Sequence, residues 1–322
     1  MKLLLAPFLL LGVAWAAAAL WFDGPASRAL AGTLAAGFAL ASVALYVAVR
    51  PAPRAALGVA LGVAAVALWW LRIPPSNARA WLPDVAHPAE VHFEGSRVTI
   101  ENVRNFHYRS ETDYDEVWET RSYDLDRLTG VDLFFSFWGP TAIAHTIVSW
   151  EFEDAAPLAI SIETRNEKGE EYSAVRGFFR QFELYYVVAD ERDVIGVRTN
   201  QRGEHAFLYR VRMPLEAARA LLVNYLEEVE RLAHHPRWYN AFSHNCTTTI
   251  RMHLQNVGLA RALNWRLFAN GYLDQLMYER GTIDTSLPFA ELRARSEVTE
   301  KAKAAGSAAD FSRRIREGLP GF

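Results

Sequence analysis

Three uncharged apolar stretches at the N-terminus constrain this chain more than any other feature. They cover residues 3–22, 29–49 and 55–71. At a rise of about 1.5 Å per residue, a helix of about 20 residues crosses the roughly 30 Å hydrocarbon core of a bilayer. We therefore expect three transmembrane helices. A cleaved signal peptide is the alternative for the first stretch, but that stretch is longer than a usual signal core and two more follow at once.

Basic residues in the short connections predict the orientation of these helices. Lys2 precedes the first stretch, and Arg50 and Arg54 separate the second from the third. The positive-inside rule then places the N-terminus in the cytoplasm and the chain beyond the third helix outside. We expect a multi-pass protein with a membrane anchor over residues 1–73 and an exterior domain over residues 74–322.

The exterior segment is long enough to bury a core as one domain. The net charge of the whole chain is only -3, with acidic and basic residues interspersed. A nucleic-acid-binding protein would carry a basic stripe, so no nucleic-acid partner is expected. We find no metal-ligand spacing and no glycine-rich phosphate loop, and therefore expect no metal and no cofactor.

The patterning of the exterior segment predicts strands first and helices later. Residues 142–152 ("AIAHTIVSWEF") and 158–165 ("LAISIETR") form the clearest hairpin, and extended runs are also expected within 90–109 and 131–137. Residues 214–235 carry apolar side chains at helical spacing and start with a proline, as helices often do. The predicted fold class is α+β, with antiparallel strands and segregated helices.

Cys246 is the only cysteine in the sequence, so its thiol is either a small buried apolar group or a reactive one. The preceding Asn245 is a preferred helix N-cap, which would place Cys246 in the first helical turn, where the helix dipole favours a thiolate. Packing in the core is an equally open alternative at this point. Asn245 is expected to cap the helix, and positioning of the thiol is its alternative role.

The pairing register of the hairpin identifies a candidate general base. A turn centred on Asp154 places His145 opposite Glu163 and Ile147 opposite Ser161, and it collects the large apolar side chains on the other face. An imidazole beside a carboxylate is the arrangement that orients a general base and stabilises its imidazolium. A surface ion pair is the alternative.

Several stretches together resemble a known family. "AIAHTIVSWEF", "ISIETRNEKGEEYS", "GFFRQFELYYVVADERDVIGVRTN" and "FSHNCTTTIR" look like the Lnb-type periplasmic domain of bacterial lipoprotein N-acyltransferases, from about Trp81 to the C-terminus. The order of histidine first and cysteine last also resembles circularly permuted papain-like (NlpC/P60-like) folds, some of which carry acyl groups as thioesters. In the acyltransferases the transmembrane helices follow the periplasmic domain, whereas here they precede it, which leaves the acceptor open.

The resemblance implies a bacterial inner-membrane protein with a periplasmic domain that acts as a thiol acyltransferase. An acyl chain would pass from a phospholipid through a Cys246 thioester to an amine acceptor such as a lipoprotein N-terminus. His145 would be the base and Glu163 the orienting group, with Ser161 or no third member as the alternatives. Arg165 is a candidate for a phosphate head group, with an ion pair to acidic residues as the ordinary alternative. The rival functions are a papain-like cysteine peptidase or amidase and a non-catalytic lipid- or lipoprotein-binding module.

Overall fold

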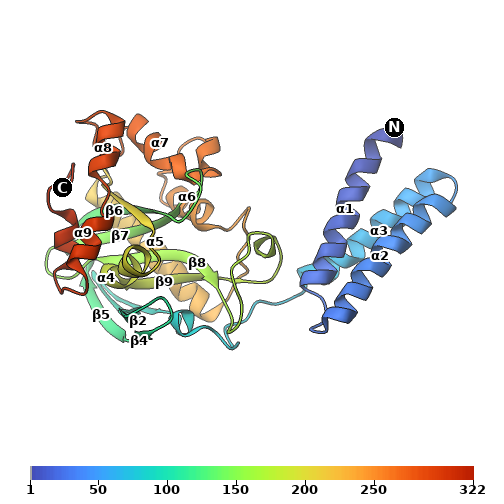
Figure 1. The fold of residues 1–322 in the computed structure, drawn as a ribbon, viewed down its shortest axis with the longest axis horizontal. Helices are drawn as coiled ribbons and strands as arrows, with labels where there is room; N and C mark the ends of the chain where they lie inside the picture. Colours follow the sequence, from blue (N-terminus) through green and yellow to red (C-terminus); the bar gives the residue numbers. More distant parts are fainter. Residues whose placement is uncertain (1) are drawn as a thin grey trace. The chain divides into compact units, whose positions relative to one another are not determined.

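The computed structural model describes residues 2–322 and divides into two compact units. The anchor unit comprises the chain up to Ser76 together with Glu171–Glu183 and Trp238–Ala241. The exterior unit comprises the three segments Asn77–Glu170, Leu184–Arg237 and Phe242–Phe322 (Figure 1). Each unit is described by itself.

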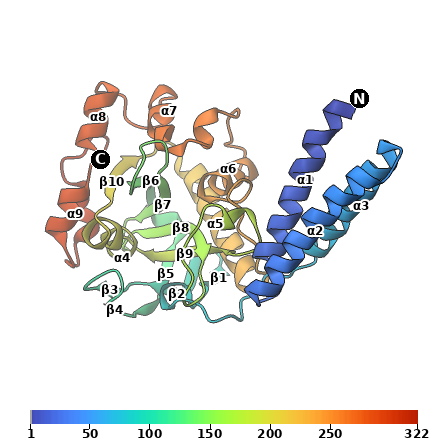
Figure 2. The same cartoon turned by 45° about the vertical axis from the view of Figure 1, so that its right-hand side comes forward.

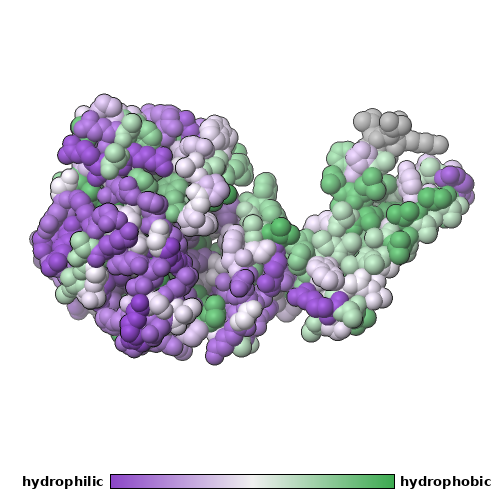
Figure 3. All heavy atoms as spheres, in the orientation of Figure 1, coloured by the Kyte–Doolittle hydropathy of each residue, from purple (hydrophilic) through white to green (hydrophobic). Residues whose placement is uncertain are grey.

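Three helices make up most of the anchor unit: α1 (Lys2–Phe22), α2 (Arg28–Ala48) and α3 (Ala52–Leu71). Their visible surface is predominantly hydrophobic (Figure 3). Within the described residues, α2 and α3 are long and apolar enough to cross a membrane, by length and composition. The apolar part of α1 that can be assessed, Ala6–Phe22, is shorter. The structure therefore supports two of the three expected spans, together with association with a membrane.

The carboxylate of Asp23, just after α1, ties the returning chain segments to the helix ends of the anchor unit. It accepts hydrogen bonds from Trp70 Nε1 at 2.6 Å and from Gln181 Nε2 at 2.6 Å. The guanidinium of Arg180 lies over the Trp70 ring, 4.4 Å from its centroid, and donates to the carbonyl of Ile73 at 2.9 Å. Asp23 and Arg180 thus join these segments to the helix ends inside the unit.

A mixed sheet forms the centre of the exterior unit. Within the described residues it has eight strands in the order β1-β2-β9-β8-β7-β6-β10, with β5 paired to β2. The strands are β1 (Glu90–Glu94), β2 (Arg97–Arg104), β5 (Trp118–Asp124), β6 (Leu128–Phe137), β7 (His145–Phe152), β8 (Leu158–Arg165), β9 (Glu183–Asp190) and β10 (His205–Arg210). A separate small pair joins β3 (His107–Tyr108) to β4 (Tyr114–Asp115).

The strands and the hairpin register largely follow the sequence. Ile147 pairs with Ser161 and Ser149 with Ala159, which confirms the predicted register. The expectation of purely antiparallel strands is wrong, because β9 pairs with β2 in parallel. The chain between β2 and β9 contains β3 to β8, and so long a connection permits parallel pairing. The fold class is α+β with a mixed sheet.

Helices cover both faces of this sheet. They are α4 (Glu191–Val194), α5 (Leu215–His234), α6 (Cys246–Asn256), α7 (Leu273–Glu279), α8 (Phe289–Arg295), α9 (Thr299–Ala305) and α10 (Phe311–Arg316). On one face Trp150 packs edge-on against Tyr225 of α5, with ring centroids 5.0 Å apart. On the other face Ile147 joins a core cluster with Val194 and Ile315. Both faces of β7 are therefore buried.

A buried charge cluster connects the C-terminal helix to the sheet. Arg316 of α10 donates to Asp132 of β6 at 2.8 Å and to Glu191 of α4 at 2.6 Å, and its Nε lies 2.5 Å from Glu151 of β7. Arg210 pairs with Asp132 and Glu151 from the neighbouring strand. Because Asp132 and Glu191 are fully buried, their charges depend on these two arginines.

We predict that Arg316→Ala lowers the free energy of unfolding by about 3–5 kcal/mol, because it leaves buried carboxylates without their partner. The matched control is Arg313→Ala on the same helix, whose side chain is 65% exposed and pairs with Asp310 and Glu317 at the surface. That variant should change stability little. Denaturant unfolding of the full chain in detergent, followed by tryptophan fluorescence, measures both. Equal losses in the two variants would contradict the assigned role of Arg316.

Candidate active site

The two residues that the sequence singled out begin two neighbouring elements. His145 is the first residue of β7, and Cys246 is the first residue of α6. Helix α6 packs against α5, where His253 stacks on Tyr225 with ring centroids 3.8 Å apart. Figure 2 shows α6 close to the end of the sheet from which β7 starts. The backbone N–H of Thr146 lowers the pKa of the Cys246 thiol, so the thiol lies beside the start of β7.

The imidazole of His145 reaches a carboxylate through a serine hydroxyl. Its Nε2 is 2.6 Å from Ser161 Oγ, which donates to Glu163 Oε1 at 2.7 Å, while the direct distance from Nε2 to Glu163 Oε1 is 3.7 Å. Since the Ser161 proton goes to the carboxylate, the hydroxyl accepts from Nε2–H of the neutral ring. Nδ1 is then the ring nitrogen that can accept a proton.

Arg198 holds the Glu163 carboxylate in place. Its Nη2 donates to Glu163 Oε1 at 2.7 Å, and its Nη1 lies 3.6 Å from Glu204 Oε2. Arg198 belongs to a π-helical turn, Val197–Gln201, and its side chain is buried. Burial by itself raises the pKa of Glu163, but the charge of Arg198 and the hydrogen bond from Ser161 oppose it, and that pKa lies well below its usual range. The carboxylate is therefore ionised at neutral pH.

The environment of His145 favours its uncharged form. Burial, followed by the nearby charge of Arg198, lowers the pKa of the imidazole to about 3, and the opposing effect of Glu163 is smaller. The ring is therefore a neutral base at physiological pH. It is oriented for proton acceptance but carries no resting positive charge.

The thiol of Cys246 is surrounded by hydrogen-bond donors and yet is not acidified. Thr247 Oγ1 lies 3.8 Å and Asn270 Nδ2 3.9 Å from the sulfur. Burial raises the pKa of the thiol, and the hydrogen bonds from Thr247 and Thr146 only partly oppose it. This corrects the expectation of a stabilised thiolate, because desolvation outweighs the effect of the helix start. Within residues 2–322, no hydrogen bond joins the sulfur directly to the His145 ring.

Asn270 locks the start of β7 to the start of α6. Its Oδ1 accepts from the backbone N–H of Ala144 at 2.9 Å, and its Nδ2 donates to the Ala144 carbonyl at 2.5 Å and to Thr247 Oγ1 at 2.8 Å. At the next position, Gly271, an added Cβ would lie 1.9 Å from the carbonyl oxygen of Thr141. Only glycine permits this close approach of the two loops.

The remaining candidates from the sequence have structural contacts. Asn245 caps α6 as predicted, since its Oδ1 accepts from the Thr248 N–H at 2.9 Å and Thr248 Oγ1 accepts from the Asn245 N–H at 3.0 Å. Arg165 is buried, its Nε donates to the Val85 carbonyl at 2.8 Å, and its guanidinium lies 4.4 Å from the centroid of the Trp81 ring. These are structural contacts, and a contact of Arg165 with a substrate head group stays a prediction.

Sequence reasoning missed Arg198, Thr247 and Asn270. Asn270 precedes a glycine, which indicates only a turn, and its partner Ala144 lies 126 positions away. Arg198 lies in a turn after β9 and α4 and belongs to no recognisable motif. Only the folded chain brings these side chains to the histidine and the cysteine.

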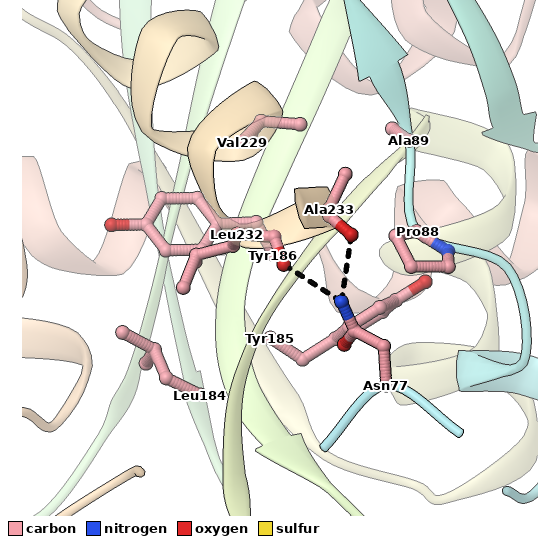
Figure 4. Close-up of a pocket in the computed structure, with 9 residues that line it drawn as sticks. All are labelled: Asn77, Pro88, Ala89, Leu184, Tyr185, Tyr186, Val229, Leu232 and Ala233. Atoms are coloured by element: carbon pink, nitrogen blue, oxygen red, sulfur yellow. Dashed lines mark hydrogen bonds between the residues drawn. The ribbon is translucent and has the colours of Figure 1, made fainter. Parts of the chain in front are cut away.

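A small pocket elsewhere in the exterior unit offers no competing site. It lies between Asn77, β9 and the end of α5, and neither His145 nor Cys246 lines it. Asn77 Nδ2 donates to the carbonyls of Leu232 and Ala233 at 3.0 and 2.7 Å, so the Asn77 amide is paired with two carbonyls of the pocket wall (Figure 4). Across the part of the chain that the structure describes, no group of three or more His, Cys, Asp or Glu side chains could hold a metal ion.

Comparison with known proteins gives one match. No curated protein and no solved structure matches the chain. The family model of the Lnb N-terminal periplasmic domain matches residues 114–271. The matched range begins at β4, contains His145, Glu163 and Cys246, and ends at Gly271, beside the asparagine that joins their elements. Residues 114–271 of this chain are therefore similar to the Lnb N-terminal periplasmic domain.

Proposed function

We propose that the chain is a membrane-anchored periplasmic acyltransferase that carries an acyl group on Cys246. The donor is a phospholipid ester and the acceptor is an amine, such as the N-terminus of a lipoprotein. The observation that carries the proposal is the convergence of a thiol, a neutral imidazole and an ionised carboxylate at the start of β7, inside an Lnb periplasmic domain. These side chains are sufficient for acyl transfer without a metal or a cofactor.

The protonation states dictate how the first half-reaction proceeds. The Cys246 sulfur attacks the ester carbonyl carbon while its proton passes to His145 Nδ1, so the charged pair forms only during the attack. Glu163, through Ser161, stabilises the resulting imidazolium. Backbone N–H groups at the start of α6 stabilise the tetrahedral oxyanion. Hydrogen bonds between catalytic groups are often long in a free enzyme and shorten when the substrate binds.

The first half-reaction ends when the carbon–oxygen bond of the ester breaks, the His145 imidazolium gives its proton to the leaving alkoxide, and the acyl group stays on Cys246 as a thioester. In the second half-reaction the acceptor amine attacks the thioester, and His145 takes the amine proton. The Cys246 thiolate then leaves and regains its proton from the His145 imidazolium. The acyl chain ends on the amine as an amide, and both enzyme groups return to their resting forms.

The proposal also covers the fold class of the exterior unit and the membrane topology of the chain. A cysteine at the start of a helix that packs on a sheet, with the histidine earlier in the chain, is the arrangement of permuted papain-like (NlpC/P60-like) enzymes. We assign the chain to that class, with α1, α2 and α3 spanning the bacterial inner membrane and the exterior unit in the periplasm. The Lnb match and the apolar helices support this placement.

A cysteine peptidase or amidase would use the same residues with water as the acceptor, and a lipid- or lipoprotein-binding module would use none of them. The apolar helices favour acyl transfer, because a phospholipid donor and a lipidated acceptor both reside at the bilayer to which the chain is anchored.

A reporter fusion tests the orientation. An enzyme reporter that is active only in the periplasm should be active when fused after Arg72 and inactive when fused at Pro51, because Arg50 and Arg54 hold that connection in the cytoplasm. Activity at Pro51 and none after Arg72 would reverse the assignment.

Intact-mass spectrometry of the full chain after incubation with phospholipid tests the chemistry. The wild type should gain the mass of one acyl chain on its only cysteine, and neutral hydroxylamine should remove that mass. Cys246→Ser should give no hydroxylamine-labile adduct. His145→Ala should slow adduct formation by about 10²–10⁴-fold because the thiol then lacks its base. Glu163→Gln should slow it less. His205→Ala, at an exposed histidine of β10, is the matched control and should react as the wild type does.

The same assay separates the alternatives. Release of peptide fragments from cell-wall material without an acyl adduct would identify a hydrolase. Folded wild-type protein that shows neither reaction would identify a binding module. Adduct formation at the wild-type rate in both Cys246→Ser and His145→Ala would overturn the proposed roles of these residues.

A further inference from the structure

Large hydrophobic side chains are exposed on three segments that surround the start of α6. The segments are the connection from β6 to β7, the residues that enter α6, and the connection from α6 to α7. We call these side chains the rim; they are Trp138, Ile143, Phe242, Leu263, Trp265 and Phe268, each more than half exposed. Monomeric soluble proteins rarely expose an apolar cluster of this kind, and such clusters mark interaction surfaces.

Contacts near the thiol hold the three segments together. The Gly271 N–H donates to the Ala142 carbonyl at 3.0 Å, which joins the α6–α7 connection to the β6–β7 connection. Phe242 stacks on Phe268 with ring centroids 5.9 Å apart, which joins the entry of α6 to the α6–α7 connection. Asn270 links both connections to the start of α6. The three segments that carry the rim are therefore joined beside the start of α6, and Figure 2 shows these connections beside α6 and α7.

The charges of these segments are all of one sign. Residues 242–272 contain Arg251, Arg261 and Arg266 and no aspartate or glutamate, and residues 138–144 contain no charged side chain. Arg266 pairs with Glu279 and lies over the Trp265 ring, whereas Arg261 is exposed. Segments that lie in the interface of an anionic bilayer combine tryptophan and phenylalanine with arginine and lack acidic residues.

We propose that the rim docks on the surface of an anionic lipid bilayer. Its aromatic side chains enter the headgroup region, Arg261 contacts lipid phosphates, and the start of α6 then faces the lipid. The apolar helices of the same chain bring a bilayer within reach of the exterior unit. The use of this docking, to present a phospholipid ester to Cys246, rests on the proposed acyl transfer, whereas the docking itself needs no reactive thiol.

Site-specific fluorescence tests the docking on the full chain. Cys246→Ser supplies a cysteine-free background, because the sequence has no other cysteine. Leu263→Cys and Phe268→Cys are introduced one at a time, with Glu300→Cys on α9, where the side chain is 84% exposed, as the control position. Each variant is labelled with a polarity-sensitive fluorophore and reconstituted into vesicles of phosphatidylethanolamine and phosphatidylglycerol that carry headgroup-level spin-labelled lipid.

We expect lipid-borne quenching at positions 263 and 268 to exceed that at position 300 by at least about twofold, because interfacial side chains lie roughly 5–10 Å deep in the headgroup region. Adding Trp265→Glu to the Leu263→Cys variant should abolish the excess, whereas Trp265→Tyr should retain it. Circular dichroism of the two Trp265 variants shows whether each has folded.

Equal quenching at the three positions would overturn the proposal. Protection from aqueous iodide at 263 and 268 without lipid-borne quenching would also overturn it and would indicate that another protein or a second copy covers the rim. The test is independent of the proposed function, because it uses chains without the Cys246 thiol. Docking together with no acyl adduct in the wild type would reject the acyl transfer alone.

Discussion

The pairing of β7 with β8 is the constraint on which the rest of the exterior unit depends. Because both faces of β7 are buried, a slip by one residue would turn Trp150 away from α5 and Ile147 away from the opposite cluster. Neither face could tolerate that exchange. The same register sets Ser161 and Glu163 beside the first residue of the strand, so the packing that stabilises the sheet also orients the His145 ring.

Long-range polar contacts complete the site on this frame. Asn270 fixes the start of α6 against the start of β7, and Arg198 keeps the Glu163 carboxylate charged. Burial acts in opposite directions on the two proton-exchanging groups, since it raises the pKa of the Cys246 thiol and lowers that of His145. The resting pair is therefore uncharged, and the proton remains on sulfur until an electrophile is in place. Such a site stores no exposed thiolate that could react with oxidants.

The sequence predicted the parts of this site that depend on local patterning. Alternation gave the β7–β8 register, helical spacing gave α5, and the preference of asparagine for helix N-termini gave the start of α6. It could not predict Asn270 or Arg198, whose partners are distant in the chain. It also misjudged the pKa of the thiol, because burial is a tertiary property that no local motif reports. The burial of Arg165 was not predicted for the same reason, since nothing in its sequence neighbours indicates the carbonyls that its guanidinium contacts.

The rate at which iodoacetamide alkylates Cys246, measured against pH, tests the uncharged resting pair most directly. The chain has one cysteine, so the rate reports a single thiol. Burial raises the thiol pKa above the ordinary value of about 8.5, so the rate should keep rising with pH beyond that value, with no plateau near neutrality. A rate that reaches its plateau below about pH 7 would show a preformed thiolate–imidazolium pair and contradict the account.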